Sequence, residues 1–235
     1  MAIEYRITLD DNHQFSYRIE LDRQYDPQGA EATPKWTRLE NNQCSNCPLK
    51  KDEFSRCPAA VDLHRVIEDF QGLPAFKKAQ VWVRTPEREY SKQVGLEEGL
   101  RSLLGVIMAT SACPVLGKLK PMAHNHLPFA SSQEFILRTI SLYLTRQYFN
   151  FREGRLADWE LKGLVKQFQQ LQLVNQAFWQ RIHDVCEGDS NLKAFLTFFL
   201  AAGALYLMVT LVSNLIIGII EKRARRGFAR PEGAA

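Results

Sequence analysis

The amino-acid sequence predicts an α+β fold in which β-hairpins come first and a helical bundle follows. Apolar and polar residues alternate along residues 3–21 and 79–94, which is typical of half-buried strands. From residue 96 onward the apolar residues recur every three or four positions, which is typical of helices. Residues 194–220 carry no charge. The full prediction is therefore N-terminal β-hairpins with a metal-clipped loop, then a helical bundle, plus one C-terminal transmembrane helix.

Two β-hairpins are expected in the first hundred residues. In the first, over residues 3–21, the alternating apolar residues are Ile3, Tyr5, Ile7, Leu9, Phe15, Tyr17, Ile19 and Leu21. Residues 10–13 between its arms are Asp-Asp-Asn-His, which favour a turn. The second hairpin, over residues 79–94, alternates in the same way. Residues 22–58 show little periodicity and contain four prolines, so this irregular stretch needs something that holds it in place.

Four helices are expected after or between these hairpins. The first covers about residues 59–71. The apolar stripe of the second consists of Leu96, Leu100, Leu103, Leu104, Ile107 and Met108. The third begins at a capping box made by Ser131 and Glu134, because a serine followed three residues later by a glutamate satisfies the free amides of a helix start. Asp158 is expected to cap the long fourth helix.

The composition excludes some classes of function. Lys and Arg number 30 and Asp and Glu 26, and the resulting net charge of +4 is too small to indicate a nucleic-acid partner. No phosphate-binding glycine loop, G-x-S-x-G elbow or H-E-x-x-H motif occurs, so nothing marks an enzyme. The first residues do not resemble a cleaved secretory signal. Five cysteines, an odd number without such a signal, predict reduced thiols rather than a disulfide framework.

Four of the cysteines, Cys44, Cys47, Cys57 and Cys113, are the candidate metal ligands. Cys44 and Cys47 form a C-x2-C knuckle, in which two thiolates on a tight turn can face one ion. A metal ion shared by all four residues would tie the irregular stretch to the helices, and its binding free energy would become folding free energy. Three histidines compete with Cys113 for the fourth position, namely His64, His124 and His126.

The sequence leaves the type of metal open. Zinc is favoured, because tetrahedral coordination by cysteine thiolates is common at structural zinc sites. An iron–sulfur cluster is the first alternative, since cysteine followed by proline also occurs at such clusters. Pro48, Pro58 and Pro114 each follow a cysteine of the set. The second alternative is that the thiols are unligated or form disulfides.

Residues 193–221 are expected to form one transmembrane helix, because its 27 consecutive uncharged residues exceed the roughly 20 that span a bilayer. The alternative is a central helix of a large soluble core. Residues 1–192 would form a soluble α+β domain with the cysteine metal site, and residues 222–235 a basic tail. We expect the soluble domain on the cytoplasmic side, because free thiols are typical of a reducing compartment. The alternative is the opposite orientation, which the basic residues after the apolar segment favour.

Small and polar residues form one stripe along the uncharged segment, at Gly203, Tyr206, Thr210, Ser213 and Asn214. In lipid, such a stripe lets two helices approach closely and share hydrogen bonds, so self-association is expected. The alternative is that these hydroxyl groups bond only to the backbone of their own helix.

Several short motifs resemble an uncharacterised bacterial family, a domain of unknown function. They are Gln-Cys-Ser-Asn-Cys-Pro-Leu at 43–49, Met-Ala-Thr-Ser-Ala-Cys-Pro at 108–114 and His-Leu-Pro-Phe-Ala at 126–130. The resemblance covers about residues 3–192, and the sequence departs from it after Asn191, where the family ends in a shorter and less apolar segment. The resemblance implies that the four cysteines belong to one design, and it supplies no activity.

The expected function is that of a membrane-anchored, metal-stabilised interaction or sensing module rather than an enzyme. Its expected partners are the lipid bilayer, a second copy of the chain through the transmembrane helix and an unidentified protein, with no nucleic acid. The alternative is a redox protein that carries an iron–sulfur cluster or reactive thiols on the same cysteines.

Overall fold

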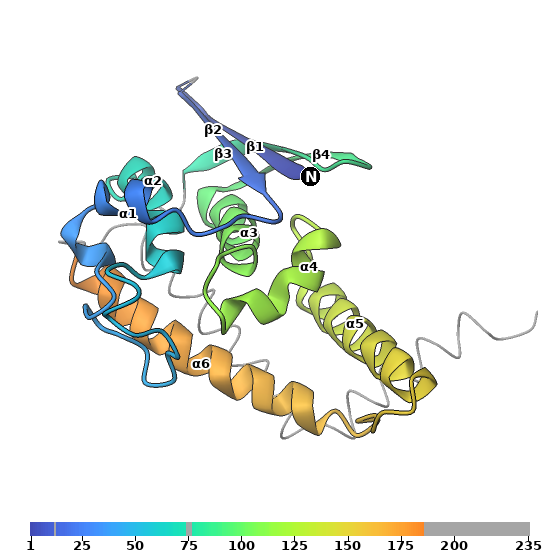
Figure 1. Cartoon of the computed structure of the whole chain (residues 1–235). Coiled ribbons are helices and arrows are strands. Elements are labelled where there is room, and N and C mark those ends of the chain that lie inside the picture. Colours follow the sequence, from blue (N-terminus) through green and yellow to red (C-terminus); the bar gives the residue numbers. More distant parts are fainter. Residues whose placement is uncertain (12, 74–76, 186–235) are drawn as a thin grey trace, which may run out of the picture.

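The computed structural model describes residues 1–11, 13–73 and 77–185, in which helices lie against one face of an antiparallel sheet (Figure 1). The strands are β1 (Ala2–Leu9), β2 (Gln14–Glu20), β3 (Lys78–Arg84) and β4 (Glu89–Gly95). Their order is β2-β1-β3-β4, so the two hairpins lie side by side and their first strands pair at the centre. The α+β part of the predicted fold and both predicted hairpins are confirmed.

The inner face of the sheet is built by alternate residues of each strand. Tyr5 of β1 lies opposite Tyr17 of β2 and Val83 of β3. The inward-facing residues of β1, which are Ile3, Tyr5, Ile7 and Leu9, are all buried. Successive side chains of a strand point to opposite faces, so the outer face carries the polar set. There the guanidinium of Arg6 lies 4.8 Å from the ring centroid of Trp82.

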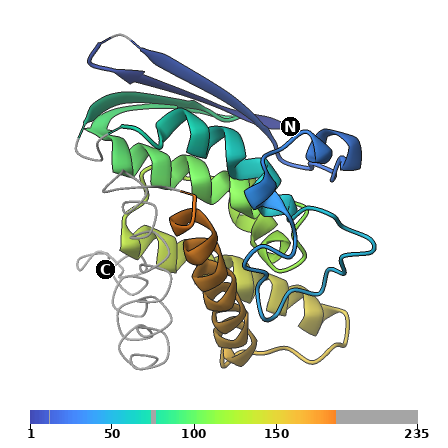
Figure 2. The same ribbon diagram turned by 90° about the vertical axis from the view of Figure 1, so that its left-hand side faces the viewer.

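The helices surround this inner face. Before the second hairpin come α1 (Pro27–Glu31), the short 3-10 helix η1 (Lys35–Thr37) and α2 (Pro58–Phe70). After it come α3 (Leu96–Ala109), η2 (Leu116–Leu119), α4 (Lys120–His124), α5 (Ser132–Arg152) and α6 (Lys162–His183). In Figure 2, α2 and α3 lie directly beneath the sheet, and α6 lies on the far side of them. The described chain is thus layered as sheet, helix pair and outer helix.

A close approach at Gly99 sets the distance between α3 and the sheet. A Cβ atom added to Gly99 would lie 2.7 Å from Cγ2 of Val81 in β3. Val81 is fully buried and β-branched, so its side chain has little freedom to move away. The absence of a side chain at Gly99 therefore lets the helix pack closely on the strand.

The two long helices, α5 and α6, begin with different capping interactions. The predicted capping box of α5 is confirmed: the Glu134 amide donates to Ser131 Oγ at 3.3 Å, and the Ser131 amide donates to the Glu134 carboxylate at 2.8 Å. In α6 the residue at the cap position is Leu161, which has a left-handed backbone with φ of 61°. Asp158 lies outside that position, yet its carboxylate accepts the Gly163 amide at 2.6 Å and so still binds the first turn.

The expected single-pass membrane architecture is corrected. Within residues 1–11, 13–73 and 77–185, no helix is sufficiently long and apolar to traverse a bilayer. α5 and α6 have 21 and 22 residues, but they carry charges such as Arg146 and Lys166 where a spanning helix is apolar. Residues 193–221, on which that expectation rested, lie outside the described residues, as does the stripe Gly203, Tyr206, Thr210, Ser213 and Asn214.

We expect Gly99→Ala to lower the free energy of unfolding by about 1–3 kcal/mol, because the added methyl group meets the buried Val81 side chain. Urea denaturation followed by circular dichroism measures the change. Gly72→Ala is the matched control, since a Cβ atom there meets nothing within 4 Å. An equal effect of both substitutions would contradict the close packing of α3 on β3.

Candidate functional site

The predicted cysteines lie in a region organised around the guanidinium of Arg181 in α6. Arg181 is only 1 % exposed. Its Nη1 donates to the carbonyl oxygens of Trp36 at 2.8 Å and Arg38 at 2.6 Å, and its Nη2 donates to that of Leu39 at 3.3 Å. The segment 36–39 of the irregular stretch is thereby fixed to α6. A buried arginine supplies the restraint that the sequence analysis assigned to a metal ion.

All four predicted cysteines are brought to this region by three separate segments. Cys44 and Cys47 lie in the irregular stretch, Cys57 occupies the cap position of α2, and Cys113 follows the end of α3. Ionisation of Cys47, Cys57 or Cys113 would raise the pKa of the Cys44 thiol, so the four sulfurs are near enough to influence one another. Their clustering was expected, and the structure places them together.

Burial controls the protonation of these thiols. It raises the pKa of Cys44 to about 12 and the pKa of Cys113 to about 11, and it raises the pKa of Cys57 as well. The positive charge of Arg181 acts in the opposite direction on Cys44 and Cys57, but burial has the larger effect. These three thiols are therefore protonated at neutral pH and are weak nucleophiles.

The C-x2-C segment itself forms a hydrogen-bonded turn. The Cys47 amide donates to the carbonyl oxygen of Cys44 at 2.9 Å. Between them, the Asn46 side-chain amide donates to both oxygen atoms of Gln170 in α6, at 3.0 Å to the carbonyl and 2.8 Å to the side chain. The turn is thus attached to the same helix that carries Arg181.

The predicted metal-clipped loop is corrected. Among the described residues, no group of three or more His, Cys, Asp or Glu side chains is arranged to hold a metal ion. The physical reason is that the loop carbonyl groups converge on the guanidinium of Arg181, and each thiol packs against the apolar core. The described residues therefore hold no binding group at Cys44, Cys47, Cys57 and Cys113 for the expected zinc or iron–sulfur cluster.

The three competing histidines are engaged elsewhere. Nδ1 of His64 lies 2.6 Å from the carbonyl oxygen of Val61 within α2, and Nε2 of His124 lies 3.6 Å from the carboxylate of Asp22. Nε2 of His126 lies 2.5 Å from the hydroxyl group of Tyr5. None of the three contacts involves a cysteine.

Tyr5 and His126 belong to a buried polar cluster that sequence analysis missed. The Tyr5 hydroxyl group also lies 2.7 Å from Oγ of Ser102 in α3. Burial raises the pKa of Tyr5, and burial together with the nearby charge of Arg138 lowers the pKa of His126 to about 3. Both groups are neutral near pH 7, so the cluster joins the sheet, α3 and the segment after α4 by uncharged hydrogen bonds.

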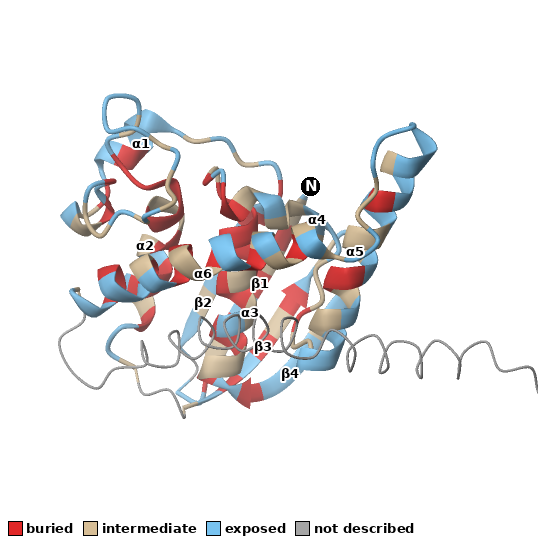
Figure 3. Ribbon diagram, turned by 90° about the horizontal axis from the view of Figure 1, so that it is seen from below, coloured by how far each residue is buried: buried red, intermediate tan, exposed pale blue. Residues whose placement is uncertain are grey.

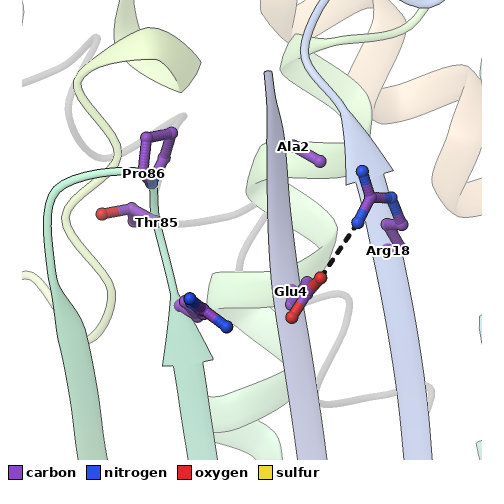
Figure 4. Close-up of a pocket in the computed structure, with 6 residues that line it drawn as sticks. Ala2, Glu4, Arg18, Thr85 and Pro86 are labelled. Atoms are coloured by element: carbon purple, nitrogen blue, oxygen red, sulfur yellow. Dashed lines mark hydrogen bonds and ion pairs between the residues drawn. The ribbon is translucent and has the colours of Figure 1, made fainter.

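An open hollow of about 170 Å³ lies at one end of the sheet and is lined by Ala2, Glu4, Arg18, Arg84, Thr85 and Pro86 (Figure 4). Its charges are already paired. Arg18 binds Glu4 at 3.0 Å, and Arg84 lies 3.7 Å from Glu89. None of the predicted site residues lines it, and it brings together no nucleophile and base.

A second surface missed from the sequence consists of the C-terminal end of α5 and the turn that leads to α6. Five large apolar side chains are exposed there: Tyr148 46 %, Phe149 55 %, Phe151 61 %, Leu156 99 % and Trp159 53 %. We call these five residues the apolar tip. In Figure 3 this end of α5 is mostly exposed and lies at the edge of the described chain. These five residues lie outside the apolar stripes of the two helices, and this position in the sequence could have marked them as exposed.

A polar network holds the backbone of this turn. The Tyr143 hydroxyl group donates to the Asp158 carboxylate at 2.8 Å, and the Asp158 amide donates to the Gln147 side chain at 2.9 Å. The Tyr143 hydroxyl lies where a side chain of Gly163 would be, so a glycine is needed at the start of α6. The apolar tip is therefore presented by a hydrogen-bonded turn.

We expect Arg181→Met to lower the free energy of unfolding by about 2–4 kcal/mol, because the carbonyl groups of Trp36, Arg38 and Leu39 lose a charged donor. Thermal denaturation gives the global effect, and trypsin cleavage within residues 39–56 reports the loop. Arg101→Met is the control, since that side chain is exposed and paired only with Glu97. Equal stability of the two variants would refute the anchoring role of Arg181.

Alkylation of Cys44 by iodoacetamide should be slow and strongly dependent on pH. With a pKa of about 12 in place of 9.0, its thiolate fraction at about pH 8.5 is lower by a factor on the order of 10³. The rate should rise about tenfold per pH unit beyond the pH at which an ordinary thiol levels off. Peptide mass spectrometry measures the labelling, with the chain unfolded in guanidinium as control. Equal rates in the folded and unfolded chain would rule out the burial effect.

Comparison with known proteins places the chain in a family. No curated protein and no solved structure matches it. Residues 3–213 match a family described as a domain of unknown function (DUF6901). The match includes the segments that carry the four cysteines and the apolar tip, and it continues past residue 192, where the motif resemblance was expected to end. The chain therefore belongs to the DUF6901 family.

Proposed function

We propose that this protein is an interaction module that docks reversibly on the surface of an anionic phospholipid bilayer through its apolar tip. The observation that carries the proposal is the exposure of all five tip side chains, by 46 to 99 % of their surface. Groups of exposed large apolar residues mark contact surfaces in water-soluble proteins. The contact is peripheral, made by the turn between α5 and α6, and involves no membrane-spanning helix.

The residue types favour lipid as the occupant. Tryptophan and tyrosine are enriched at the interface between headgroups and hydrocarbon, because their rings are amphipathic. Tyr148 and Trp159 supply such rings, and Leu156 at the outermost position supplies a purely apolar side chain. Phe151 and Trp159 contact edge to face, with ring centroids 6.1 Å apart, so the two sides of the turn form one apolar surface.

Positive charges next to the tip favour an anionic bilayer. Arg146 and Arg152 are exposed, and no carboxylate of the described residues lies within ion-pair distance of either one. Arg152 instead donates to the hydroxyl group of Tyr148 at 3.2 Å. A basic side chain at an anionic membrane surface contributes about 1 kcal/mol. These arginines are placed to contact lipid phosphates while the tip enters the interface.

The expected affinity is modest. Transfer of about 100 Å² of apolar surface from one half-exposed aromatic side chain contributes about 2 kcal/mol. The ordering of the tip and the loss of translational freedom offset part of this gain. Reversible binding to vesicles is therefore expected, and single tip residues should matter measurably.

Trp159→Ala should weaken binding to vesicles about tenfold, because it removes one of the largest apolar surfaces of the tip. Co-sedimentation of the full chain with phosphatidylcholine vesicles that contain about one-third phosphatidylserine measures the partition coefficient. Trp179→Ala is the matched control: Trp179 is 37 % exposed on α6, outside the tip, and stacks on His183. Its removal should leave the partition coefficient unchanged.

Three outcomes would overturn the proposal. One is equal loss of binding in the two tryptophan variants, and another is equal binding of wild type and Trp159→Ala. The third is an oligomeric wild-type chain, as measured by light scattering, that becomes monomeric when the tip is substituted, because the tip would then contact a second copy.

Arg152→Gln should weaken binding to anionic vesicles and leave binding to pure phosphatidylcholine unchanged.

A further inference from the structure

The C-x2-C turn carries an inference that is independent of bilayer docking. We propose that Cys44 and Cys47 form a reversible disulfide when the protein meets a hydroperoxide. Oxidation converts these two neighbouring thiols to one S–S bond, and the buried thiols of Cys57 and Cys113 stay reduced.

The backbone of the turn brings the two residues within disulfide range. Its hydrogen bond from the Cys47 amide to the Cys44 carbonyl oxygen, at 2.9 Å, closes a four-residue turn. In such a turn the first and last Cα atoms lie less than about 7 Å apart. A disulfide needs a Cα–Cα distance of about 4.4–6.8 Å. The turn therefore accommodates the S–S bond with little movement of the backbone.

The position of the turn leaves this pair open to a small oxidant. Cys44 and Cys47 are half-buried, whereas Cys57 and Cys113 are buried beneath the turn. Asn46, between the two cysteines, holds the turn on α6 through Gln170. Both thiols consequently stay at one surface, where a hydroperoxide reaches them before it reaches the buried pair.

The chemistry balances in two steps. The sulfur of one cysteine attacks the hydroperoxide, which transfers one oxygen atom, leaves as water or an alcohol and converts the thiol to a sulfenic acid. The thiol of the second cysteine then displaces the hydroxyl group, forms the S–S bond and releases one water molecule. The pair loses two electrons, and a small dithiol returns them by exchange.

Arg181 acts in this reaction as a positioning residue. Its charge lies within electrostatic range of Cys44, Cys47 and Cys57, and no carboxylate of the described chain forms an ion pair with it. The guanidinium therefore stabilises negative charge that develops on the attacking sulfur. Burial acts against ionisation, so the disulfide forms slowly and responds to prolonged oxidation rather than to a brief pulse.

The test uses the purified full chain, first reduced and then exposed to hydrogen peroxide near pH 8. Non-reducing peptide mass spectrometry should find Cys44 joined to Cys47, with two thiols lost per chain and both recovered with dithiothreitol. Cys44→Ser and Cys47→Ser should each abolish this loss of two thiols. Cys113→Ala is the matched control and should preserve it. Arg181→Met should slow formation severalfold, and Arg181→Lys, which keeps the positive charge but lacks the forked guanidinium that holds the loop, should restore part of the rate and keep the same linkage.

Several results would overturn the inference. A disulfide that includes Cys57 or Cys113 would show that the turn does not select the pair. Oxidation to sulfinic acid at both residues without any S–S bond would show the same. One equivalent of zinc or iron bound to the purified chain, with all four thiols protected from peroxide, would mean that they are ligands instead. None of these results would affect the proposal that the apolar tip binds vesicles.

Discussion

The irregular part of this fold depends on one buried cation. Arg181 extends from α6 into the interior and donates to three carbonyl groups within residues 36–39, a segment about 140 residues earlier. Because an uncompensated guanidinium is costly to bury, those hydrogen bonds have to form together or not at all. The loop that bears Cys44 and Cys47, the start of α2 at Cys57 and the position of α6 are all tied to that contact.

The two proposed activities use different parts of α6. At its first turn, Gly163 and Asp158 fix the turn that presents the apolar tip. Toward its last turn, Arg181 fixes the loop that presents the two half-buried thiols. The same helix therefore supports both a surface suited to lipid and a surface suited to a small oxidant. Each can be altered by substitution without touching the other.

Local elements were predictable from the sequence, and their distant contacts were not. Alternation gave both hairpins, and the capping box of α5 was recognised, because these signals lie within a few neighbouring residues. The burial of Arg181 was not predicted, since nothing in the neighbouring sequence marks it as buried. The four cysteines were predicted to form one metal site, but no metal-binding group is found among the described residues. Tyr5 matched a strand pattern, whereas its partner His126 is more than a hundred residues away.

The order of the strands also governs how the chain reaches this structure. Each hairpin closes through a short turn, but the central ladder joins β1 to β3 across about seventy residues. Contacts between distant parts of a chain slow folding, so we expect the pairing of β1 with β3 to be slower than the closure of either hairpin. Pairing of β1 with β3 closes the intervening segment into a loop, and the entropic cost of this closure grows only with the logarithm of the loop length. A one-residue shift in the register of β1 against β3 would turn the buried side chains of β1 toward solvent, so the register of this central pair is the alignment on which the sheet depends.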